Sequence, residues 1–369
     1  MSHPIRILQV VTHMNRGGLE TMIMNYYRHI DREKVQFDFL VHRQERAAYD
    51  DEIESLGGII YRLPRLVPWS RSYLRTLDHF FADHPEYRIV HVHQDCLSSV
   101  ILKAAKRHGV PVRIAHSHNS MQDKNFKYPI KLWYRQFIPP YATTLFSCGR
   151  DAGEWMFGKH DFQILNNAID CGAYRFDPLQ RNRLRAELFI AENTFVVGHV
   201  GRFSPQKNHE FLIDIFASVH EQCPDSVLLL VGDGELRAQI ELKVQDLGLQ
   251  DHVIFTGVRS DVANLMQAMD VFVFPSLYEG LPVTMVEAQA AGLPCFISDK
   301  VPKDCILTDL VTQIPLTALP SQWCESILRS SLSLPRNNPH DQLCAVGFDI
   351  VANAQFLEEF YLHESTVQK

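Results

Sequence analysis

The sequence predicts an α/β protein with two doubly wound parallel sheets. Short β-branched or apolar runs alternate with longer amphipathic stretches along the whole chain, which is typical of βα units. The chain has 369 residues, enough for two domains of ordinary size. With 46% hydrophobic and 21% charged residues, its composition is that of a globular protein rather than a disordered, collagenous or disulfide-scaffold chain.

Eleven apolar runs predict the strands. The first sheet takes residues 5–11, 35–41, 59–63, 88–93, 111–116 and 143–147, and the second takes residues 194–200, 226–231, 252–256, 270–275 and 294–298. Residues 300–345 contain several prolines and predict irregular structure with one short helix near 323–330. Residues 348–363 carry apolar side chains at helical spacing and predict a final helix.

We expect the domain boundary where residues 163–165 run into turn-forming asparagines. The expected domains are then residues 1–166 and 167–345, with a helix in 346–369 returning to the N-terminal domain. Ligands of doubly wound sheets bind at the carboxyl ends of the strands. Two such domains facing each other across a cleft are therefore expected to bind their ligand there.

Charge and cysteine usage exclude several classes of protein. Residues 1–170 carry 22 Lys and Arg against 18 Asp and Glu, and the remainder carries 14 against 25, which disfavours a general nucleic-acid binder. No uncharged apolar run is long enough to span a membrane, and the first run is too short for the core of a signal peptide. Eight cysteines without a Cys-x-x-Cys pair favour a reduced, cytoplasmic protein without bound zinc.

Residues 270–294 carry the most informative pattern, a buried strand followed by a turn and a helix. Pro282 suits the first helical turn, Gly292 the position after the helix and Pro294 the stop. The free amides of such a helix start attract anions, so we expect a diphosphate cradle in this turn. Its residues are Gly280, Leu281 and Thr284.

Two glutamates flank this turn. An ionised carboxylate in the helix, Glu287, can accept two hydrogen bonds from the vicinal hydroxyls of a ribose. Glu279 in the turn lies closer to whatever follows the phosphates. A bare pair of this spacing is also common on a solvated helix face.

A second strand end, within residues 195–208, carries two cations. Arg202 and Lys207 can neutralise a diphosphate, and Asn208 is the expected cap of the helix that follows. Two exposed surface cations are the alternative interpretation.

Glycines and histidines follow strands in the N-terminal half. Gly17 and Gly18 open a helix and leave its amides accessible, although plain turn chemistry explains them as well. The histidines alternate along two predicted strands as His91 and His93, then His116 and His118. A metal site is not favoured, because no acidic or cysteine partner of suitable spacing accompanies them.

Residues 124–138 interleave cations with aromatic side chains. Such a stretch can lie on an anionic membrane surface, and it can equally form an ordinary amphipathic helix whose aromatic face is buried. Both interpretations stay open, and contact with RNA is a more remote third.

The segment 270–294, together with Arg202 and Lys207, resembles the nucleotide-sugar motif of glycosyltransferase family 4, whose members have the GT-B fold. Residues 1–120 look most like the capsule and exopolysaccharide branch of that family. The resemblance implies a retaining transfer of a sugar from a nucleotide diphosphate sugar, with a UDP-sugar expected, to a glycan or lipid-linked acceptor. It implies no cofactor and no catalytic metal. A cytoplasmic location is expected, and association with the inner face of the cell membrane stays open.

The resemblance also implies roles for individual residues. Glu287 holds the donor ribose, and Arg202 and Lys207 bind the diphosphate and assist its departure. Glu279 and His118 are expected to be catalytic residues together with these two cations. Gly17 and Gly18 are expected to contact the donor phosphates. His118 is the first choice for contact with the donor sugar, and His116 is the second. Val258 and Arg259 are expected to lie near the base. The N-terminal domain is expected to bind the acceptor and the C-terminal domain the nucleotide sugar.

Three other functions remain open at this point. A nucleotide-sugar epimerase on the same fold would use a similar diphosphate cradle. A non-catalytic scaffold that binds nucleotide sugars would lack transfer activity, although the four charged residues argue against a dead site. A dinucleotide oxidoreductase is disfavoured, because the glycine pair lacks the Gly-x-Gly-x-x-Gly pattern.

Overall fold

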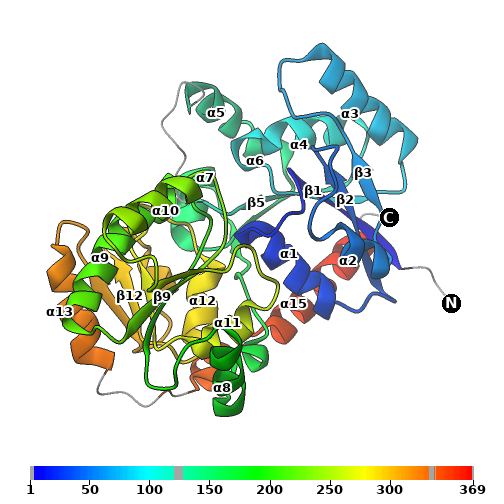
Figure 1. Ribbon diagram of the computed structural model, residues 1–369. Helices are drawn as coiled ribbons and strands as arrows, with labels where there is room; N and C mark the ends of the chain where they lie inside the picture. The colour runs from blue at the N-terminus through cyan, green and yellow to red at the C-terminus, as the bar shows by residue number, and fades with distance from the viewer. Residues whose placement is uncertain (1–3, 120–127, 332–335, 337, 368–369) are drawn as a thin grey trace. The chain divides into compact units, whose positions relative to one another are not determined.

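The computed structural model describes residues 4–119, 128–331, 336 and 338–367. The chain forms two compact units (Figure 1). The first comprises residues 1–168 and 350–369, and the second comprises residues 169–349. Each unit is built on one parallel sheet.

The first unit has a seven-stranded parallel sheet in the order β3-β2-β1-β4-β5-β6-β7. Its strands are β1 Ile5–Val11, β2 Val35–Val41, β3 Ile60–Arg62, β4 Ile89–Val92, β5 Val112–Ser117, β6 Thr144–Ser147 and β7 Gln163–Ile164. Its helices are α1 Gly18–His29, α2 Asp50–Ser55, α3 Arg71–Asp83, α4 Ser98–Arg107, α5 Tyr128–Arg135, α6 Ile138–Tyr141, α7 Arg150–Phe157 and α15 Ile350–Val367, with a 3₁₀ turn at Asp95–Leu97.

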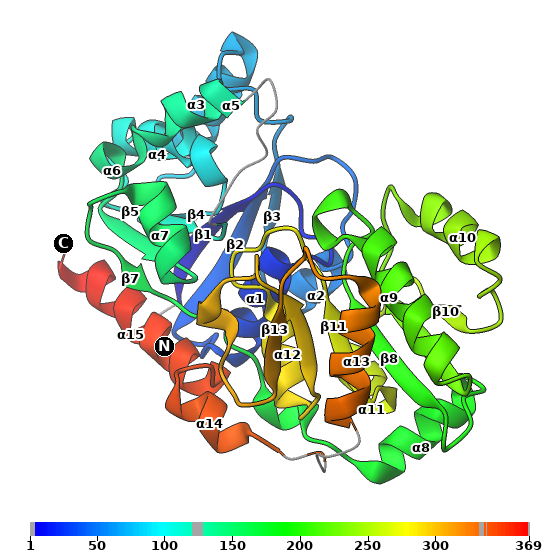
Figure 2. The same cartoon turned by 90° about the vertical axis from the view of Figure 1, so that its left-hand side faces the viewer.

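The second unit has a six-stranded parallel sheet in the order β10-β9-β8-β11-β12-β13. Its strands are β8 Phe195–Val200, β9 Ser226–Val231, β10 Val253–Phe255, β11 Val271–Phe274, β12 Cys295–Ser298 and β13 Val311–Ile314. Its helices are α8 Pro178–Glu187, α9 His209–Gln222, α10 Arg237–Asp246, α11 Val262–Ala268, α12 Val283–Ala290, α13 Pro320–Ser331 and α14 His340–Ala345, with 3₁₀ turns at Cys171–Tyr174, Pro205–Lys207 and Lys303–Cys305. Helix α13 lies alongside α9 (Figure 2).

All eleven expected strands are present, each with ends within one residue of the prediction. The prediction for residues 300–345 was wrong in part, because this segment also contains β13 and α14. Strand β13 is a short edge strand whose burial alternates weakly, so its sequence lacks the continuous apolar run that marks the central strands. The expected helix near residues 323–330 is the second half of α13.

The last helix, α15, belongs to the first unit rather than to the second. It lies beside α1 and β2 (Figure 1). Lys34 pairs with Glu358 at 3.1 Å, and Phe37 packs edge-on against Tyr361. Ile350, Ala354, Leu357 and Tyr361 of α15 are buried, as the helical spacing of the apolar residues predicts, whereas Val351 and Phe356 are exposed.

The strand order reverses direction at one point in each sheet, between β1 and β4 in the first unit and between β8 and β11 in the second. Loops that leave neighbouring strands on opposite faces of a sheet separate at such a point and leave a crevice for a ligand. The glycine pair follows β1, Arg202 and Lys207 follow β8, and Glu279 follows β11. The candidate residues therefore concentrate at the two reversal points.

Among the helices of the described residues, none combines the length and the apolar character needed to cross a bilayer. All eight cysteines are free thiols, and most of them are buried.

Candidate active site

The loop after β8 and the turn after β11 are joined by hydrogen bonds at the reversal point of the second sheet. The backbone N–H of Leu277 donates to the carbonyl of Gln206 at 2.8 Å. The Gln206 side chain donates to the carbonyl of Tyr278 at 3.0 Å and to Oε2 of Glu279 at 3.1 Å. These bonds hold the two segments that carry the charged candidates in a fixed register.

Lys207 and Glu279 form an ion pair, with Nζ and Oε1 separated by 2.6 Å. Both side chains are largely shielded from water, at 15% and 6% exposure. The Lys207 ammonium also lies 4.5 Å from the ring centroid of Phe274 in β11. Shielding strengthens the electrostatic interactions of this pair, so its charges act on a bound ligand more strongly than surface charges do.

Asn208 is the N-cap residue of α9, as predicted, but it does not cap the helix through its side chain. Its backbone is left-handed, with φ of +56°, and its side chain makes no capping bond to the described helix. Nδ2 donates instead to the carbonyl of Pro275 at 3.1 Å. Asparagine tolerates this conformation, so the residue ties the loop to the end of β11 rather than satisfying the helix.

Glu287 lies inside α12 with only 5% of its surface exposed. Oε1 accepts a hydrogen bond from the Tyr174 hydroxyl at 2.7 Å. Burial raises the pKa of Glu287 to about 7, and the hydrogen bond from Tyr174 opposes this shift. The carboxylate is therefore oriented by Tyr174 and close to its protonation midpoint near neutral pH.

Helix α12 begins at Val283, one residue after the predicted start at Pro282. Pro282 occupies the N-cap position, where it has no side-chain oxygen to cap the described helix start. Gly292 adopts φ of +68°, and Leu293 N–H donates back to the carbonyl of Ala288 at 3.1 Å, which closes the helix. Of the cradle residues, Gly280 and Thr284 are half-buried, whereas Leu281 is buried and therefore offers only its backbone.

Arg202, Val258 and Arg259 are more accessible to water than Lys207 and follow strands of the second sheet. The Arg202 side chain is 74% exposed and pairs with Glu235 at 3.1 Å. Val258 is exposed, and Arg259 forms a two-pronged pair with Asp261, both bonds at 2.7 Å. Arg202 thus differs from Lys207 in environment, since only the lysine is held by buried partners.

Gly232 after β9 sits against the loop that carries Arg202. It adopts φ of +137°, and a Cβ there would clash with the carbonyl oxygen of Gly201. We expect Gly232→Ala to lower the free energy of unfolding by about 2 kcal/mol or more, measured by urea denaturation. Gly248→Ala is the control, since Gly248 also has positive φ but open space around it, and an equal loss would exclude a role for the clash.

In the first unit, Gly17 is the N-cap of α1, and a Cβ at this position would clash with the carboxylate of Glu20. Gly18 is exposed. Burial raises the pKa of Glu20 to about 7, so this helix start carries a carboxyl group that is only partly ionised at neutral pH. Such a group repels an incoming phosphate less than a fully ionised one would.

The two histidine candidates differ in accessibility. His116 in β5 is 2% exposed, whereas His118 just beyond the strand is half-buried. A ligand at this strand end can therefore meet His118, and His116 contributes only through other side chains.

Three residues of the site were missed by sequence reasoning. Gln206, Phe274 and Tyr174 hold Glu279, Lys207 and Glu287, respectively. Gln206 lies within residues 195–208 and precedes Lys207 directly, so its position in the sequence was a usable signal. Tyr174 lies 113 residues before Glu287, and nothing in a single sequence pairs them.

Proteins with doubly wound parallel sheets bind their ligands at the reversal points of the strand order, where this chain carries a shielded cation and a buried carboxylate. The family model for glycosyl transferases group 1 matches residues 180–314, and that for glycosyltransferase family 4 matches residues 16–171. The putative glycosyltransferase EpsF of Bacillus subtilis is 38% identical over 369 residues and covers 96% of each chain. The chain therefore belongs to glycosyltransferase family 4.

Two further relatives and one crystal structure are also similar to this chain. A UDP-Gal:α-D-GlcNAc-diphosphoundecaprenol α-1,3-galactosyltransferase of Escherichia coli is 30% identical over 60% of each chain. The capsular polysaccharide biosynthesis glycosyltransferase CapH of Staphylococcus aureus is 22% identical over 98% of this chain and 99% of its own. The crystal structure of HepE from Anabaena in complex with UDP superposes with a TM-score of 0.79 at 20% identity, covering 97% of this chain and all of HepE. The predicted GT-B fold and glycosyltransferase class are confirmed.

Proposed function

We propose that this glycosyltransferase transfers a sugar from a UDP-sugar, with retention of configuration, to a glycan or lipid-linked acceptor in capsule or exopolysaccharide assembly. The bond between the anomeric carbon and the diphosphate breaks, a bond to an acceptor hydroxyl forms, and the acceptor proton leaves with the departing diphosphate. The observation that carries the proposal is the shielded Lys207–Glu279 ion pair at the reversal point, in a turn that leads into α12 with its buried Glu287.

In this proposal the second unit binds the nucleotide sugar and the first unit binds the acceptor. Lys207, Arg202 and the backbone N–H groups of the turn and helix start, which Pro282 lacks, stabilise the diphosphate as it gains charge when the sugar departs. Glu287 accepts hydrogen bonds from the ribose, and Val258 and Arg259 lie near the base. Glu279 stabilises the positive charge that develops at the anomeric carbon.

The choice of donor and acceptor is supported by the relatives. HepE was crystallised with UDP, and the Escherichia coli relative uses UDP-Gal and a diphosphoundecaprenol-linked acceptor. In the first unit, Gly17, Gly18 and His118 are proposed to complete the contacts to the donor phosphates and sugar.

A lipid-linked acceptor calls for contact with the membrane surface, and we propose α5 for this contact. Every residue of α5 is at least partly exposed, and Trp133 is 55% exposed. Arg135 is tied to the backbone of Trp155 and stacks on its ring, which fixes the helix on the first unit. Residues 124–127 of the expected membrane segment lie outside the described residues.

Binding of nucleotides by the intact chain tests the proposal. A ligand that binds only the folded state raises the free energy of unfolding, by about 2.7 kcal/mol when its concentration is a hundred times its Kd. The melting temperature rises as a result. We expect UDP and one UDP-sugar to raise the melting temperature, with GDP, ADP and CMP as controls and with the shift unchanged by EDTA. A shift with another nucleotide would replace the proposed donor, and a shift abolished by EDTA would contradict metal-independent binding.

The raised pKa of Glu287 predicts a pH dependence. Because its pKa rises from 4.5 to about 7 on folding, the folded state holds this proton more tightly, and the stabilisation is lost as pH rises through 7. Relative to Glu287→Gln, the wild type should lose about 3 kcal/mol of unfolding free energy between pH 4 and 8. UDP should bind the wild type more tightly as pH rises through 7, because the ionised carboxylate accepts both ribose hydroxyls. Isothermal titration of both proteins checks this, and parallel pH profiles would exclude Glu287 as the titrating group.

A further inference from the structure

One unbranched chain of hydrogen bonds runs through the interior of the first unit. Its five bonds, in order, have lengths of 2.8, 2.9, 3.3, 2.7 and 3.2 Å. The six side chains that it joins are, in the same order, His118, His93, Gln9, Tyr361, His91 and His116. They come from or directly follow the central strands β1, β4 and β5, except for Tyr361, which comes from α15.

The amide of Gln9 fixes the direction of the first two bonds. Its Oε1 can only accept, so the partner atom, Nε2 of His93, carries a proton. A neutral imidazole has one N–H, so Nδ1 of His93 must accept from Nε2 of His118. His118 therefore carries its proton on Nε2, which leaves Nδ1 as an acceptor.

The other side of the same amide fixes the remaining bonds. Nε2 of Gln9 can only donate, so the Tyr361 oxygen accepts from it and the Tyr361 hydroxyl donates a hydrogen bond to Nδ1 of His91. Nε2 of His91 then donates to Nδ1 of His116. The chain ends at Nε2 of His116, which is buried without a partner among the described residues. All four imidazoles thus carry their proton on Nε2.

This arrangement requires neutral rings, and burial provides them. Burial lowers the pKa of His91 and of His118 to about 3 and holds the pKa of His93 and of His116 well below the ordinary value. No ring of the chain is protonated twice at neutral pH, so each one has one donor and one acceptor.

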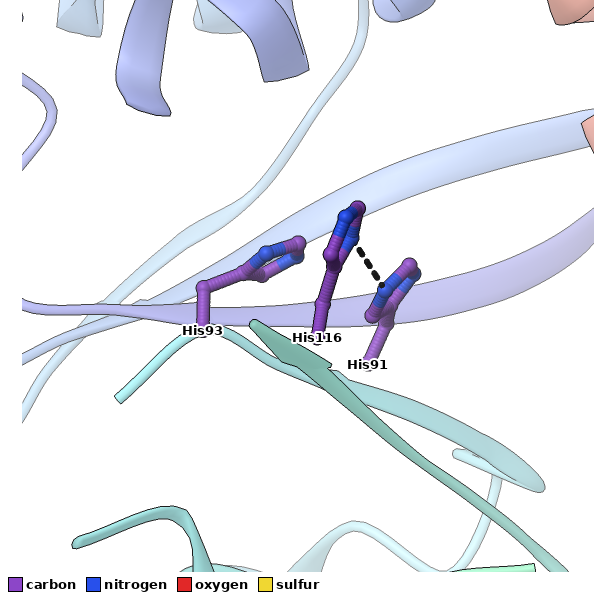
Figure 3. A group of neighbouring side chains, drawn as sticks. All are labelled: His91, His93 and His116. Carbon is purple, nitrogen blue, oxygen red and sulfur yellow. Dashed lines mark hydrogen bonds between the residues drawn. The ribbon is translucent and has the colours of Figure 1, made fainter. Parts of the chain in front are cut away.

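A metal ion is the competing explanation for His91, His93 and His116, whose ring nitrogens lie within 4.8 Å of one another. Figure 3 shows the three rings side by side, with the bond between His91 and His116. The His91 and His93 rings stack at 4.4 Å with planes 24° apart. Ligand lone pairs lie in the ring plane, so stacked rings do not direct them at one point. The geometry favours the hydrogen-bond chain.

We propose that this chain fixes the tautomer of His118 and thereby presents Nδ1 as an acceptor to a hydroxyl of the donor sugar, with Gln9 and Tyr361 as positioning residues. Nδ1 has no hydrogen-bond partner in the part of the chain that the structure describes, and the ring is half-buried at the strand end. The contact between His118 and the donor sugar rests on the proposed function. The position of the proton on the His118 ring does not. In this proposal α15 contributes to the site through Tyr361 without touching substrate.

Tyr361→Phe tests the chain, because it removes one hydroxyl and keeps the ring. Without that acceptor the Gln9 amide is free to turn over, so His93 and His118 should populate both tautomers. Proton–nitrogen correlation spectra of protein labelled with ¹⁵N-histidine should show only Nε2–H for His118 in the wild type and a mixture in Tyr361→Phe. Leu357→Val is the control, since Leu357 is buried on the same helix but makes no bond in the chain. It should leave the spectrum unchanged.

Kinetics test the link to the ligand. Tyr361→Phe should raise the KM for the donor about fivefold, the effect of one neutral hydrogen bond, and should have no further effect in a His118→Ala background. A wild-type spectrum with the proton on Nδ1, a spectrum unchanged in Tyr361→Phe, or a stoichiometric metal in the purified protein would each overturn the proposed chain. Unchanged kinetics in His118→Ala with the predicted spectra would instead refute the sugar contact and leave the tautomer assignment in place.

Discussion

Glu279→Gln is expected to lower kcat about 10²- to 10³-fold while changing the KM for the donor less than threefold. The substitution keeps the volume and, because an amide has a single acceptor oxygen, one of the two hydrogen bonds from Gln206 and Lys207, but it removes the negative charge from a shielded position. An electrostatic group that acts mainly on the transition state lowers kcat by such a factor when it is lost. Initial rates with saturating acceptor and varied donor measure both constants.

The matched control is Glu241→Gln. Glu241 also pairs with a cation of the second unit, Arg237 at 2.7 Å, but it is 41% exposed, so its charge is screened by water. We expect wild-type kinetics from this variant. Equal losses of donor affinity and of kcat in Glu279→Gln would reassign Glu279 to donor binding, and an unchanged kcat would reduce it to a structural partner of Lys207.

The fold was predictable from sequence because its signals are local. A buried parallel strand reads as a short apolar run, and β2, which is buried along its whole length, matches its prediction residue for residue. Strand β13 was missed because it is a half-exposed edge strand among prolines. Helix α15 was predicted from the helical spacing of its apolar residues, and this signal is likewise contained in one stretch of sequence.

In the candidate site, only residues that lie close together in the sequence could be predicted. Glu279 and Glu287 flank one turn, and Arg202 and Lys207 follow one strand, so pattern and resemblance found them. The contacts of Tyr174 with Glu287 and of Tyr361 with His91 join residues 113 and 270 positions apart. Such pairs are set by tertiary packing, and so is the left-handed backbone of Asn208, which turned an expected cap into a contact with Pro275.

Lys207→Met should lower kcat/KM for the donor about 10²- to 10³-fold, because it removes the one cation of the site that is held among buried partners within the described residues. If the ammonium binds the diphosphate, UDP should lose much more affinity than uridine, which has no phosphate. Isothermal titration of both ligands to the variant and to the wild type checks this difference. Equal losses for UDP and uridine would show that the whole site had been disturbed.

Stability separates the electrostatic role of Lys207 from its structural one. Lys207→Met alone leaves the Glu279 carboxylate shielded without its cation, and breaking a buried pair costs about 3 to 5 kcal/mol of unfolding free energy. The double variant Lys207→Met, Glu279→Gln has no unpaired charge, so urea denaturation should show most of that stability restored. Its transfer activity should stay as low as that of either single variant, because neither charge is present to act on the donor. Recovery of activity together with stability would mean that the pair serves only the fold.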